Sequence, residues 1–350
     1  MKIWLDALTS KQALIMHHLE KEFLKRNHEV VITCRNYDYL VSLLRLKGSS
    51  PLIFGRYGET LEDKIRAGLE REMFFVNIWE KEGKPHLHIS LTSPEAVRVA
   101  FRLKIPIIVL SDSPHSIYVN KLTMPLADLI IIPKCTPKEA YSYATNPEKI
   151  VQFDGLFEVM WIKSSHLSPT NLKALNIKPY EYIVIRPEEK KASYYFAKYE
   201  KPTRVDTLIK EVLDNTNVKI VAFPRYPDQR KFLASFPSER VIIPDTAVDS
   251  LPLLKYAIAV ITGGETMATE AALLGTPAIS FFPRRLHVMD YLIEKGFPFF
   301  HITDMKHLAD LVLKIIDAPF KYHMDVEAKL RSLEDPTTII TRSAEELVTF

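Results

Sequence analysis

Two adjacent glycines before a short helix are the feature of this sequence best suited to chemistry. Gly263 and Gly264 follow the apolar run 258–261 and precede the helix-forming residues 265–274. Glycine lets another group come close to bare backbone. The first N–H groups of a helix and the positive end of its dipole favour an anion. The pattern therefore predicts a site for a phosphate or a diphosphate.

Side chains in the first turns of this helix are suited to the rest of a nucleotide. Glu270 lies one turn after Thr266, so both can share a helix face. A carboxylate there can accept hydrogen bonds from both hydroxyls of a ribose. The charge of Glu265 would repel a phosphate, so we expect Glu265 to point away or to receive a sugar hydroxyl. In the simpler interpretation the glycines only form a turn and Glu270 is a solvated helix residue, and both interpretations stay open.

Basic residues are predicted to gather in neighbouring loops of the same half of the chain. Beside a helix N-terminus they would hold a diphosphate and stabilise it as a leaving group. Phe223 opens one of these loops and belongs to the predicted nucleotide site. For each cation taken singly, a solvated loop charge is the alternative. The cations predicted at this edge are Arg186, Lys190, Lys191, Arg225, Arg284 and Arg285.

Asp112 and His115 form the best acid–base pair in the first half of the chain. They lie in the loop 111–115, directly after the predicted strand 105–110. Histidine titrates near neutral pH and a neighbouring carboxylate can orient it, so either group could serve as a catalytic base. The alternative is that Asp112 or Ser113 caps a helix and that His115 is a surface residue.

Several other enzyme classes are poorly supported by the motifs. The sequence has no HExxH, CxxC, GxSxG or GxxxxGK[ST] pattern, which speaks against metal hydrolysis, serine hydrolysis and P-loop chemistry. Neither Cys34 nor Cys135 has a cysteine or histidine at metal-ligand spacing. We therefore expect no metal site and no cofactor beyond the substrate itself.

Composition describes an ordinary globular protein large enough for two domains. The chain has 350 residues, of which 47% are hydrophobic and 25% charged. Its formal net charge of +3 does not imply a nucleic-acid partner. Two cysteines fit a reducing cytoplasm. Met1 and Lys2 lead directly into a strand-like run, so no signal peptide is expected.

Peripheral contact with a membrane stays open. No apolar run approaches the roughly 20 residues that span a bilayer. The segment 64–71, however, combines cations with apolar residues. Such a segment can lie on a membrane surface, although a solvated helix face is the simpler interpretation. We expect a cytoplasmic protein with possible attachment to the inner membrane face.

Strands and helices alternate along both halves of the chain. The first half begins with strand 2–5, helix 11–26 and strand 29–33, a β-α-β order that favours a parallel sheet. The second half repeats this alternation without visible sequence repetition. The other predicted strands are 51–54, 87–90, 105–110, 129–132, 150–153, 182–186, 218–223, 241–243, 258–261 and 278–282. The other predicted helices are 37–47, 61–81, 93–104, 119–126, 205–214, 229–236, 249–256, 265–274, 290–295, 308–316 and 344–348.

The expected fold class is therefore α/β, with two Rossmann-like, doubly wound parallel-sheet domains that face each other across a cleft. Ligands of such sheets bind at the carboxyl ends of the strands. We expect the second domain, which carries the glycine turn, to be the nucleotide-sugar side and the first domain to be the acceptor side. The expected boundaries are 1–160 for the first domain, 161–178 for a linker, 179–335 for the second domain and 336–350 for a helix that packs back on the first.

Several segments resemble an archaeal family of unknown function with a GT-B-type glycosyltransferase fold, akin to the nonhydrolysing UDP-N-acetylglucosamine 2-epimerases. The resemblance covers nearly the whole chain. Pro114 stands where the related segment has Glu before His, and residues 8–12 lack a Pro-Pro-His run, so the donor site is the safer inference. The segments are MKIWLDALTS, KRNHEVVITCRNYD, TSPEAVRVAFRLKIPIIVLSDSPHS, NKLTMPLADLIIIP, FDGLFE, ITGGETMATEAALLGTPAI and MDYLIEKGFP.

The resemblance implies a function for the glycine turn. In GT-B enzymes the matching helix of the second domain holds a nucleoside diphosphate, with a glutamate on the ribose. This carries over to Gly263, Gly264, Thr266 and Glu270. The hypothesis is a metal-independent glycosyltransferase that moves a sugar from a nucleoside diphosphate such as UDP to a glycan, lipid or small-molecule acceptor.

Two alternatives remain beside this hypothesis. The first is a sugar-nucleotide 2-epimerase, which needs acid and base groups around the sugar. The loops of the first domain contain few paired carboxylates by sequence, which disfavours it. The second is a non-catalytic protein that binds a sugar nucleotide or acts as a scaffold.

Overall fold

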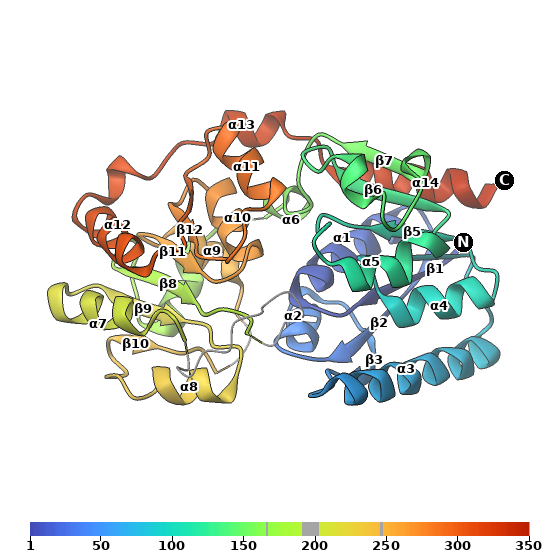
Figure 1. The fold of residues 1–350 in the computed structure, drawn as a ribbon, viewed down its shortest axis with the longest axis horizontal. Coiled ribbons are helices and arrows are strands. Elements are labelled where there is room, and N and C mark those ends of the chain that lie inside the picture. The colour runs from blue at the N-terminus through green and yellow to red at the C-terminus, as the bar shows by residue number, and fades with distance from the viewer. Residues whose placement is uncertain (166, 191–202, 246–247, 350) are drawn as a thin grey trace. The chain divides into compact units, whose positions relative to one another are not determined.

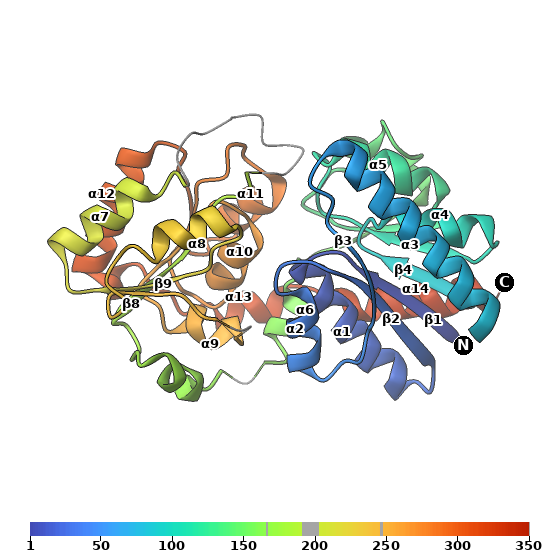
Figure 2. The same ribbon diagram turned by 90° about the horizontal axis from the view of Figure 1, so that it is seen from below.

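The computed structural model describes residues 1–165, 167–190, 203–245 and 248–349. The chain forms two compact units (Figure 1). The first contains Met1–Trp161 and the C-terminal residues from Leu333, and the second contains Ile162–Ser332. Each unit has an all-parallel sheet with helices packed on it, as Figure 2 also shows. The predicted class of two doubly wound α/β domains is confirmed.

The first unit is built on a seven-stranded sheet with the order β3-β2-β1-β4-β5-β6-β7. The chain first adds strands on one side of β1 and then on the other, so a switch point lies between β1 and β4. The strands are β1 (Lys2–Ala7), β2 (Glu29–Asn36), β3 (Leu52–Arg56), β4 (Leu87–Ser90), β5 (Ile107–Leu110), β6 (Leu129–Pro133) and β7 (Ile150–Phe153). The helices of this part are α1 (Ser10–Lys25), α2 (Leu40–Lys47), α3 (Leu61–Glu82), α4 (Pro94–Arg102), α5 (Ile117–Thr123) and α14 (Pro336–Thr349). Helix α6 (Val159–Ile162) lies at the boundary between the units.

The core of the first unit shows how α3 is anchored. Residues Ala67, Arg71, Phe75 and Trp79 are its buried positions, and their spacing of four places them on one helix face. Trp4 of β1 meets the ring of Phe75 at 4.8 Å between centroids and the ring of Trp79 at 5.1 Å. Burial of each such side chain contributes about 1.5–3 kcal/mol, which fixes α3 against the sheet.

The second unit is built on a six-stranded sheet with the order β10-β9-β8-β11-β12-β13. Its switch point lies between β8 and β11, which pair in parallel. The strands are β8 (Tyr182–Arg186), β9 (Lys219–Ala222), β10 (Val241–Ile242), β11 (Val260–Thr262), β12 (Ala278–Ser280) and β13 (Phe299–His301). The helices are α7 (Asp206–Asn215), α8 (Pro227–Leu233), α9 (Ser250–Lys255), α10 (Thr266–Leu273), α11 (His287–Glu294), α12 (Met305–Asp317) and α13 (Glu327–Ser332).

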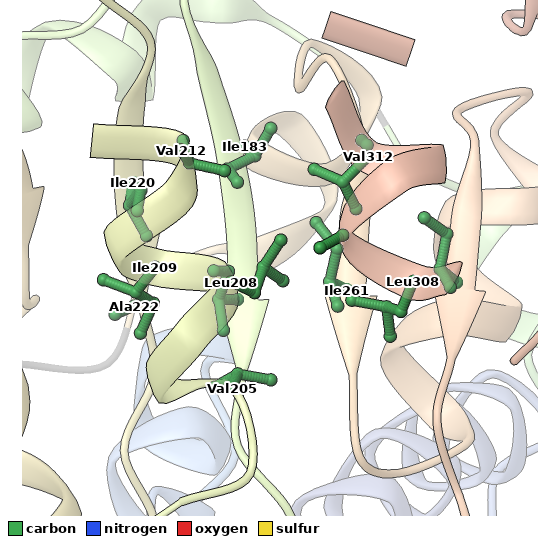
Figure 3. Close-up of a cluster of buried hydrophobic side chains, with 14 of the residues drawn as sticks. Ile183, Val205, Leu208, Ile209, Val212, Ile220, Ala222, Ile261, Leu308 and Val312 are labelled. Carbon is green, nitrogen blue, oxygen red and sulfur yellow. The ribbon is translucent and has the colours of Figure 1, made fainter. Parts of the chain in front are cut away.

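Helices α7 and α12 cover one face of this second sheet. Figure 3 shows Leu208 and Val212 of α7 beside Ile183 and Ile220, with Leu308 and Val312 of α12 near Ile261. All of these side chains are buried. Both helices bury residues at spacings of three or four, the helical period. This cluster holds β8 and β11 rigidly, and these two strands carry the loops of the candidate site.

Several element boundaries differ from the sequence-based ones. Helix α10 begins at Thr266 rather than Glu265, α2 begins at Leu40 rather than Tyr37, and α14 extends over 336–349 rather than 344–348. Helix α14 packs against α1, and Glu345 pairs with Arg26 at 3.3 Å. The segment 161–178 contains the end of α6 and a 3₁₀ helix, Pro169–Leu175.

Candidate functional site

The glycine turn of the second unit lies at the switch point of its sheet. The Gly263 N–H donates a hydrogen bond to the Arg186 carbonyl at 3.0 Å, which joins the ends of β8 and β11. A Cβ atom on Gly263 would lie only 2.5 Å from the Cα atom of Glu188. Any side chain at residue 263 would therefore displace backbone. Close approach between two loops requires this glycine.

Glu188 fixes the loop after β8 against that glycine. It is fully buried and accepts hydrogen bonds from Thr203 Oγ1 at 2.8 Å and from the Arg204 N–H at 2.9 Å. Gln229 Nε2 donates to the Glu188 carbonyl at 3.0 Å. Gly263 thus faces a residue whose carboxylate and carbonyl are both hydrogen-bonded, which holds the turn in one shape.

The N-terminus of α10 follows directly. The Gly264 N–H donates to Thr262 Oγ1 at 3.0 Å, and Ser280 Oγ donates to the Gly264 carbonyl at 2.8 Å. Glu265 is the N-cap residue, and its side chain makes no capping hydrogen bond. Residues 264–267 are partly exposed. Backbone N–H groups and the helix dipole are thus presented at a partly open turn.

Glu270 is buried, with only 3% of its surface exposed. The interpretation of Glu270 as a solvated helix residue is therefore wrong. Thr266, one turn earlier, is partly exposed, as is Glu265. A buried carboxylate in the second turn, behind a partly open first turn, suits a ligand that is neutral and rich in hydroxyls.

Two of the predicted cations lie beside the glycine turn. Arg186 ends β8, is largely buried and accepts the Gly263 hydrogen bond through its carbonyl. Arg225 Nε donates to the Pro187 carbonyl at 3.2 Å. Arg225 Nη2 lies 3.2 Å from the position that a Cβ atom on Gly264 would take. Phe223 is buried, and its N–H donates a hydrogen bond to the Ile185 carbonyl, which continues the pairing of β9 with β8.

The other predicted cations are placed differently. Lys190 pairs with Asp228, and Arg285 pairs with Asp290. Arg284 is exposed in the loop after β12. Lys191 lies outside the described residues. The structure therefore brings Arg186 and Arg225 to the glycines. Arg225 has a carboxylate partner in Glu189, at 3.6 Å, as Lys190 and Arg285 have in Asp228 and Asp290.

The first unit holds a cluster of three ionisable side chains at the carboxyl edge of its sheet. Lys11 Nζ lies 2.5 Å from Asp112 Oδ2 and 2.6 Å from Glu158 Oε1. Lys11 comes from the first turn of α1, Asp112 follows β5 and Glu158 precedes α6. Both carboxylates are buried, and Glu158 is only 1% exposed.

The environment shifts the pKa values of the two carboxyl groups of this cluster in opposite directions. Burial acts to raise the pKa of Asp112, but the charge and hydrogen bond of Lys11, the Ser113 hydroxyl and the charge of His115 outweigh it, so the pKa lies below its usual range. For Glu158, burial and the nearby charge of Asp112 prevail over Lys11 and raise the pKa. Two carboxyl groups with pKa values pushed apart are a typical acid–base arrangement.

His115 lies close enough to Asp112 for its charge to act on that carboxylate. Helix α5 begins at Ile117 with Ser116 as its N-cap. Asp112 therefore does not cap this helix, and the capping interpretation is wrong for it. Ser113 Oγ instead donates to Asp112 Oδ1 at 2.9 Å. The predicted pair Asp112 and His115 is thus brought together.

Sequence reasoning missed Lys11 and Glu158. The statement that the loops of the first domain contain few paired carboxylates is wrong, because Asp112 and Glu158 converge on Lys11. A signal was present. Glu158 is a lone acid inside the apolar run 156–162 and ends the segment FDGLFE. A charged residue in an apolar run is buried with a partner or serves a function.

The switch point of the first unit holds a buried ion pair. Arg71 Nη2 lies 2.7 Å from Asp6 Oδ1, and Thr33 Oγ1 and Ser93 Oγ donate to the Asp6 carboxylate at 2.6 and 2.5 Å. Burial acts to raise the pKa of Asp6, yet the charge of Arg71 and these hydrogen bonds lower it below the usual range. Asp6 is therefore ionised and fully paired at neutral pH. Arg71 also contacts Glu95 at 3.6 Å.

The sequence matches other proteins over almost its whole length. The profile of a family described as "Protein of unknown function (DUF354)" matches residues 1–348. A relative from Methanocaldococcus jannaschii, named "Uncharacterized protein MJ0665", is 30% identical over 345 residues, which cover 97% of this chain and 96% of that protein.

Similar folds occur in solved structures of sugar-nucleotide enzymes. The UDP-GlcNAc 2-epimerase from Neisseria meningitidis, bound to UDP-GlcNAc, matches with a TM-score of 0.73 and 16% identity, over 99% of this chain and 100% of that one. The glycotransferase of kitacinnamycin matches with a TM-score of 0.60 and 12% identity, over 98% and 99% of the two chains. At these identities the likeness concerns the fold. Among the described residues, no helix is both long enough and apolar enough to cross a membrane.

Proposed function

This chain belongs to the DUF354 family, whose function is unknown, and we propose that it is an enzyme that transfers a sugar from a nucleoside-diphosphate sugar to an acceptor. One observation carries the proposal. At the switch point of the second sheet, an obligatory glycine and a partly open helix N-terminus lie together, with the buried Glu270 one turn farther on. UDP or UDP-GlcNAc is bound in solved proteins of similar fold, which supports a UDP-sugar as the ligand class.

In the proposed donor complex, the diphosphate lies at Gly264 and the first N–H groups of α10. The helix dipole and the Arg225 guanidinium offset its negative charge. The Glu270 carboxylate accepts hydrogen bonds from the ribose hydroxyls. Arg186 and the exposed Arg284 supply further positive charge, and no metal ion is required in this proposal. Charge that develops on the leaving diphosphate is thereby stabilised.

The proposed reaction is a substitution at the anomeric carbon of the sugar. An acceptor hydroxyl forms the new C–O bond while the C–O bond to the diphosphate breaks, and the nucleoside diphosphate leaves. The proton of the acceptor passes to a base of the first unit, Asp112 or His115. Lys11 keeps the Asp112 carboxylate ionised, so that it can accept a proton at neutral pH.

Epimerisation of a sugar nucleotide is the second candidate, because the Asp112 and Glu158 pair now favours it. Inverting a carbon centre requires one group to remove a proton and another to return it on the opposite face. An ionised Asp112 and a Glu158 with raised pKa could take these two parts. Glycosyl transfer needs only one such group, so the two candidates differ in their need for Glu158.

A panel of UDP-, GDP- and dTDP-sugars tests the proposal. The purified protein is incubated with each sugar nucleotide, with and without a cell extract as a source of acceptors. Release of a nucleoside diphosphate that depends on the extract supports glycosyl transfer. An epimerised sugar nucleotide without extract supports epimerisation. Binding without turnover supports a non-catalytic protein, and absence of binding to every member of the panel contradicts the proposal.

Matched substitutions assign the residues. Glu270→Gln should weaken nucleotide binding about tenfold, the change expected for one lost charge-assisted hydrogen bond. Asp112→Asn should leave binding unchanged and lower turnover by at least about a hundredfold. The control is Asp310→Asn, an exposed position on α12. Full turnover by both Asp112→Asn and His115→Ala would show that the base lies elsewhere.

A further inference from the structure

Helix α3 presents an apolar ridge to solvent, on a side of the helix that the unit core leaves uncovered. The ridge consists of Leu61, Ile65, Leu69 and Met73, whose exposed fractions lie between 51 and 73%. Their spacing of four makes them one continuous i, i+4 row. The buried positions of α3, by contrast, lie at Ala67, Arg71, Phe75 and Trp79. An apolar row of this length on a 22-residue helix is a typical mark of an interaction surface.

A groove runs beside this ridge. It has a volume of about 470 Å³ and is lined by Phe54, Leu69, Glu70, Met73, Phe74 and Asn77. Phe54 belongs to β3, the edge strand of the sheet, and its ring stacks on that of Phe74 at 4.2 Å between centroids. The groove is mostly apolar and has the size for one or two large aliphatic side chains. A protruding residue of a partner could enter it.

The arrangement of charges identifies the partner. Between residues 59 and 73 there are five carboxylates and three cations. One of the cations, Arg71, is buried against Asp6. An anionic membrane surface would be repelled by this balance. The segment instead carries opposite charges on one flank of the ridge, where Arg66 and Glu70 stand one turn apart and are both exposed.

These features are self-complementary under a two-fold rotation. The ridge is symmetric about residue 67, so an antiparallel copy would place Leu61 against Met73 and Ile65 against Leu69. If the two-fold axis lies in the contact plane and perpendicular to the helices, the flank that carries Arg66 and Glu70 lies on the same side of the contact in both copies. Arg66 then lies within about 3 Å, measured along the helix, of Glu70 in the second copy, and this contact occurs twice. Leu61, the most exposed member of the ridge, would meet the groove beside Met73.

We propose that this chain forms a two-fold homodimer through α3, with the ridges in antiparallel i, i+4 packing and Arg66 of each copy paired with Glu70 of the other. This packing class has a crossing angle of about −50°. Crossed Arg66–Glu70 pairs at the flank of the ridge set the register of the two helices. None of these residues belongs to the glycine turn or to the Lys11 cluster, so the proposal does not depend on the function of either.

A charge-reversal cycle tests the dimer. The mass of the full chain is measured by sedimentation equilibrium over a range of concentrations. Arg66→Glu alone and Glu70→Arg alone should each weaken dimerisation by at least about tenfold, because each creates two contacts between like charges. The double variant Arg66→Glu/Glu70→Arg should restore it to within about threefold of the wild type, since the pairs are re-formed with reversed sign.

Further variants separate the dimer from the other possible occupants. Ile65→Lys should give a monomer with an unchanged circular dichroism spectrum. Leu24→Glu, at an exposed apolar position of α1, should leave the dimer intact. A monomeric wild type at all concentrations would overturn the proposal, as would a double variant no better than the single ones. Binding of the wild type, but not of Ile65→Lys, to phosphatidylglycerol vesicles without self-association would assign the ridge to a membrane instead.

Discussion

The two switch points of this molecule have the same topology and opposite chemistry. In the first unit, the carboxyl end of β1 carries Asp6, which is fully buried and paired with Arg71 of α3. In the second unit, the carboxyl end of β8 carries the largely buried Arg186, and its carbonyl accepts the N–H of Gly263 in the glycine turn after β11. One switch point is filled by an ion pair of the protein, whereas the other offers backbone N–H groups at a partly open turn.

This difference suits the two units to different proposed roles. The ion pair fills the first switch point, and the proposed acid–base groups lie farther along the sheet edge, where Lys11, Asp112 and Glu158 meet. In the second unit, we propose that the partly open N-terminus of α10 binds a diphosphate. In our proposal, the same sheet order thus serves acid–base chemistry in one unit and anion binding in the other.

Removal of one partner of the ion pair is expected to have the largest effect. Arg71→Met leaves the Asp6 charge buried without its cation and should cost about 3–5 kcal/mol of stability in the first unit. All three tryptophans lie in that unit, so unfolding by urea is followed by their fluorescence. UDP binding by the second unit should be unchanged at low urea.

The double variant Asp6→Asn/Arg71→Met is the control for this prediction. It removes both charges and should recover most of the lost stability, because no unpaired charge remains. A double variant as unstable as Arg71→Met would show that packing of the Arg71 side chain, rather than its charge, supports the first switch point.

The second largest effect is expected from acid, which should lower the stability of the first unit. Burial lowers the pKa of His88, on β4, to about 4, and Arg71 adds to this while the charge of Asp6 opposes it. The unfolded chain then binds more protons than the folded one between pH 6.5 and 4, so stability falls as the pH decreases through this interval. The loss should be on the order of 3 kcal/mol at pH 4.

Asp6 affects stability over a lower pH range than His88. Its pKa is depressed in the folded state, so its contribution persists above pH 4 and is lost only below that value. Urea unfolding at pH 7, 5.5, 4 and 3, followed by tryptophan fluorescence, measures both effects, since the step from pH 4 to 3 reports on Asp6. His88→Gln should flatten the fall between pH 6.5 and 4, and an unchanged slope in that variant would show that His88 is not its source.

The glycine turn should resist even a single methyl group. Gly263→Ala places a Cβ atom 2.5 Å from the Glu188 Cα atom, so backbone must move. We expect a loss of about 1–3 kcal/mol in the second unit, the range for overpacking. Faster hydrogen exchange of the β8 and β11 amides measures the loss. Unchanged exchange would mean that the two loops separate without cost.

Much of the fold could be predicted because buried parallel strands appear as short apolar runs. Strands such as Ile107–Leu110 and Tyr182–Arg186 are wholly buried, and their sequence shows it. The glycine turn was visible because its residues are adjacent. By contrast, β13 (Phe299–His301) was not predicted. It lies at the edge of the sheet and buries only Phe299 fully, so it lacks a continuous buried apolar run.

The polar clusters could not be predicted from local pattern. Asp6 and Arg71 are 65 positions apart, and Lys11 and Asp112 are 101 apart. Only the order of the strands in the sheet brings these residues to one sheet edge, and no single segment of the sequence predicts that order. Arg71 also falls within a heavily charged helix, where a buried cation looks like its solvated neighbours. Long-range pairing, rather than composition, defines these clusters.

Calorimetric titration of UDP into the wild type and Gly264→Ala tests the central claim most directly. A Cβ atom at residue 264 would approach only side-chain atoms, Arg225 Nη2 at 3.2 Å and Thr262 Oγ1 at 3.6 Å, so this variant should fold and melt like the wild type. Its methyl group would nevertheless stand where the diphosphate meets backbone. The account predicts that UDP binds the wild type and binds Gly264→Ala at least about tenfold more weakly. Equal affinity of the two proteins for UDP would contradict it.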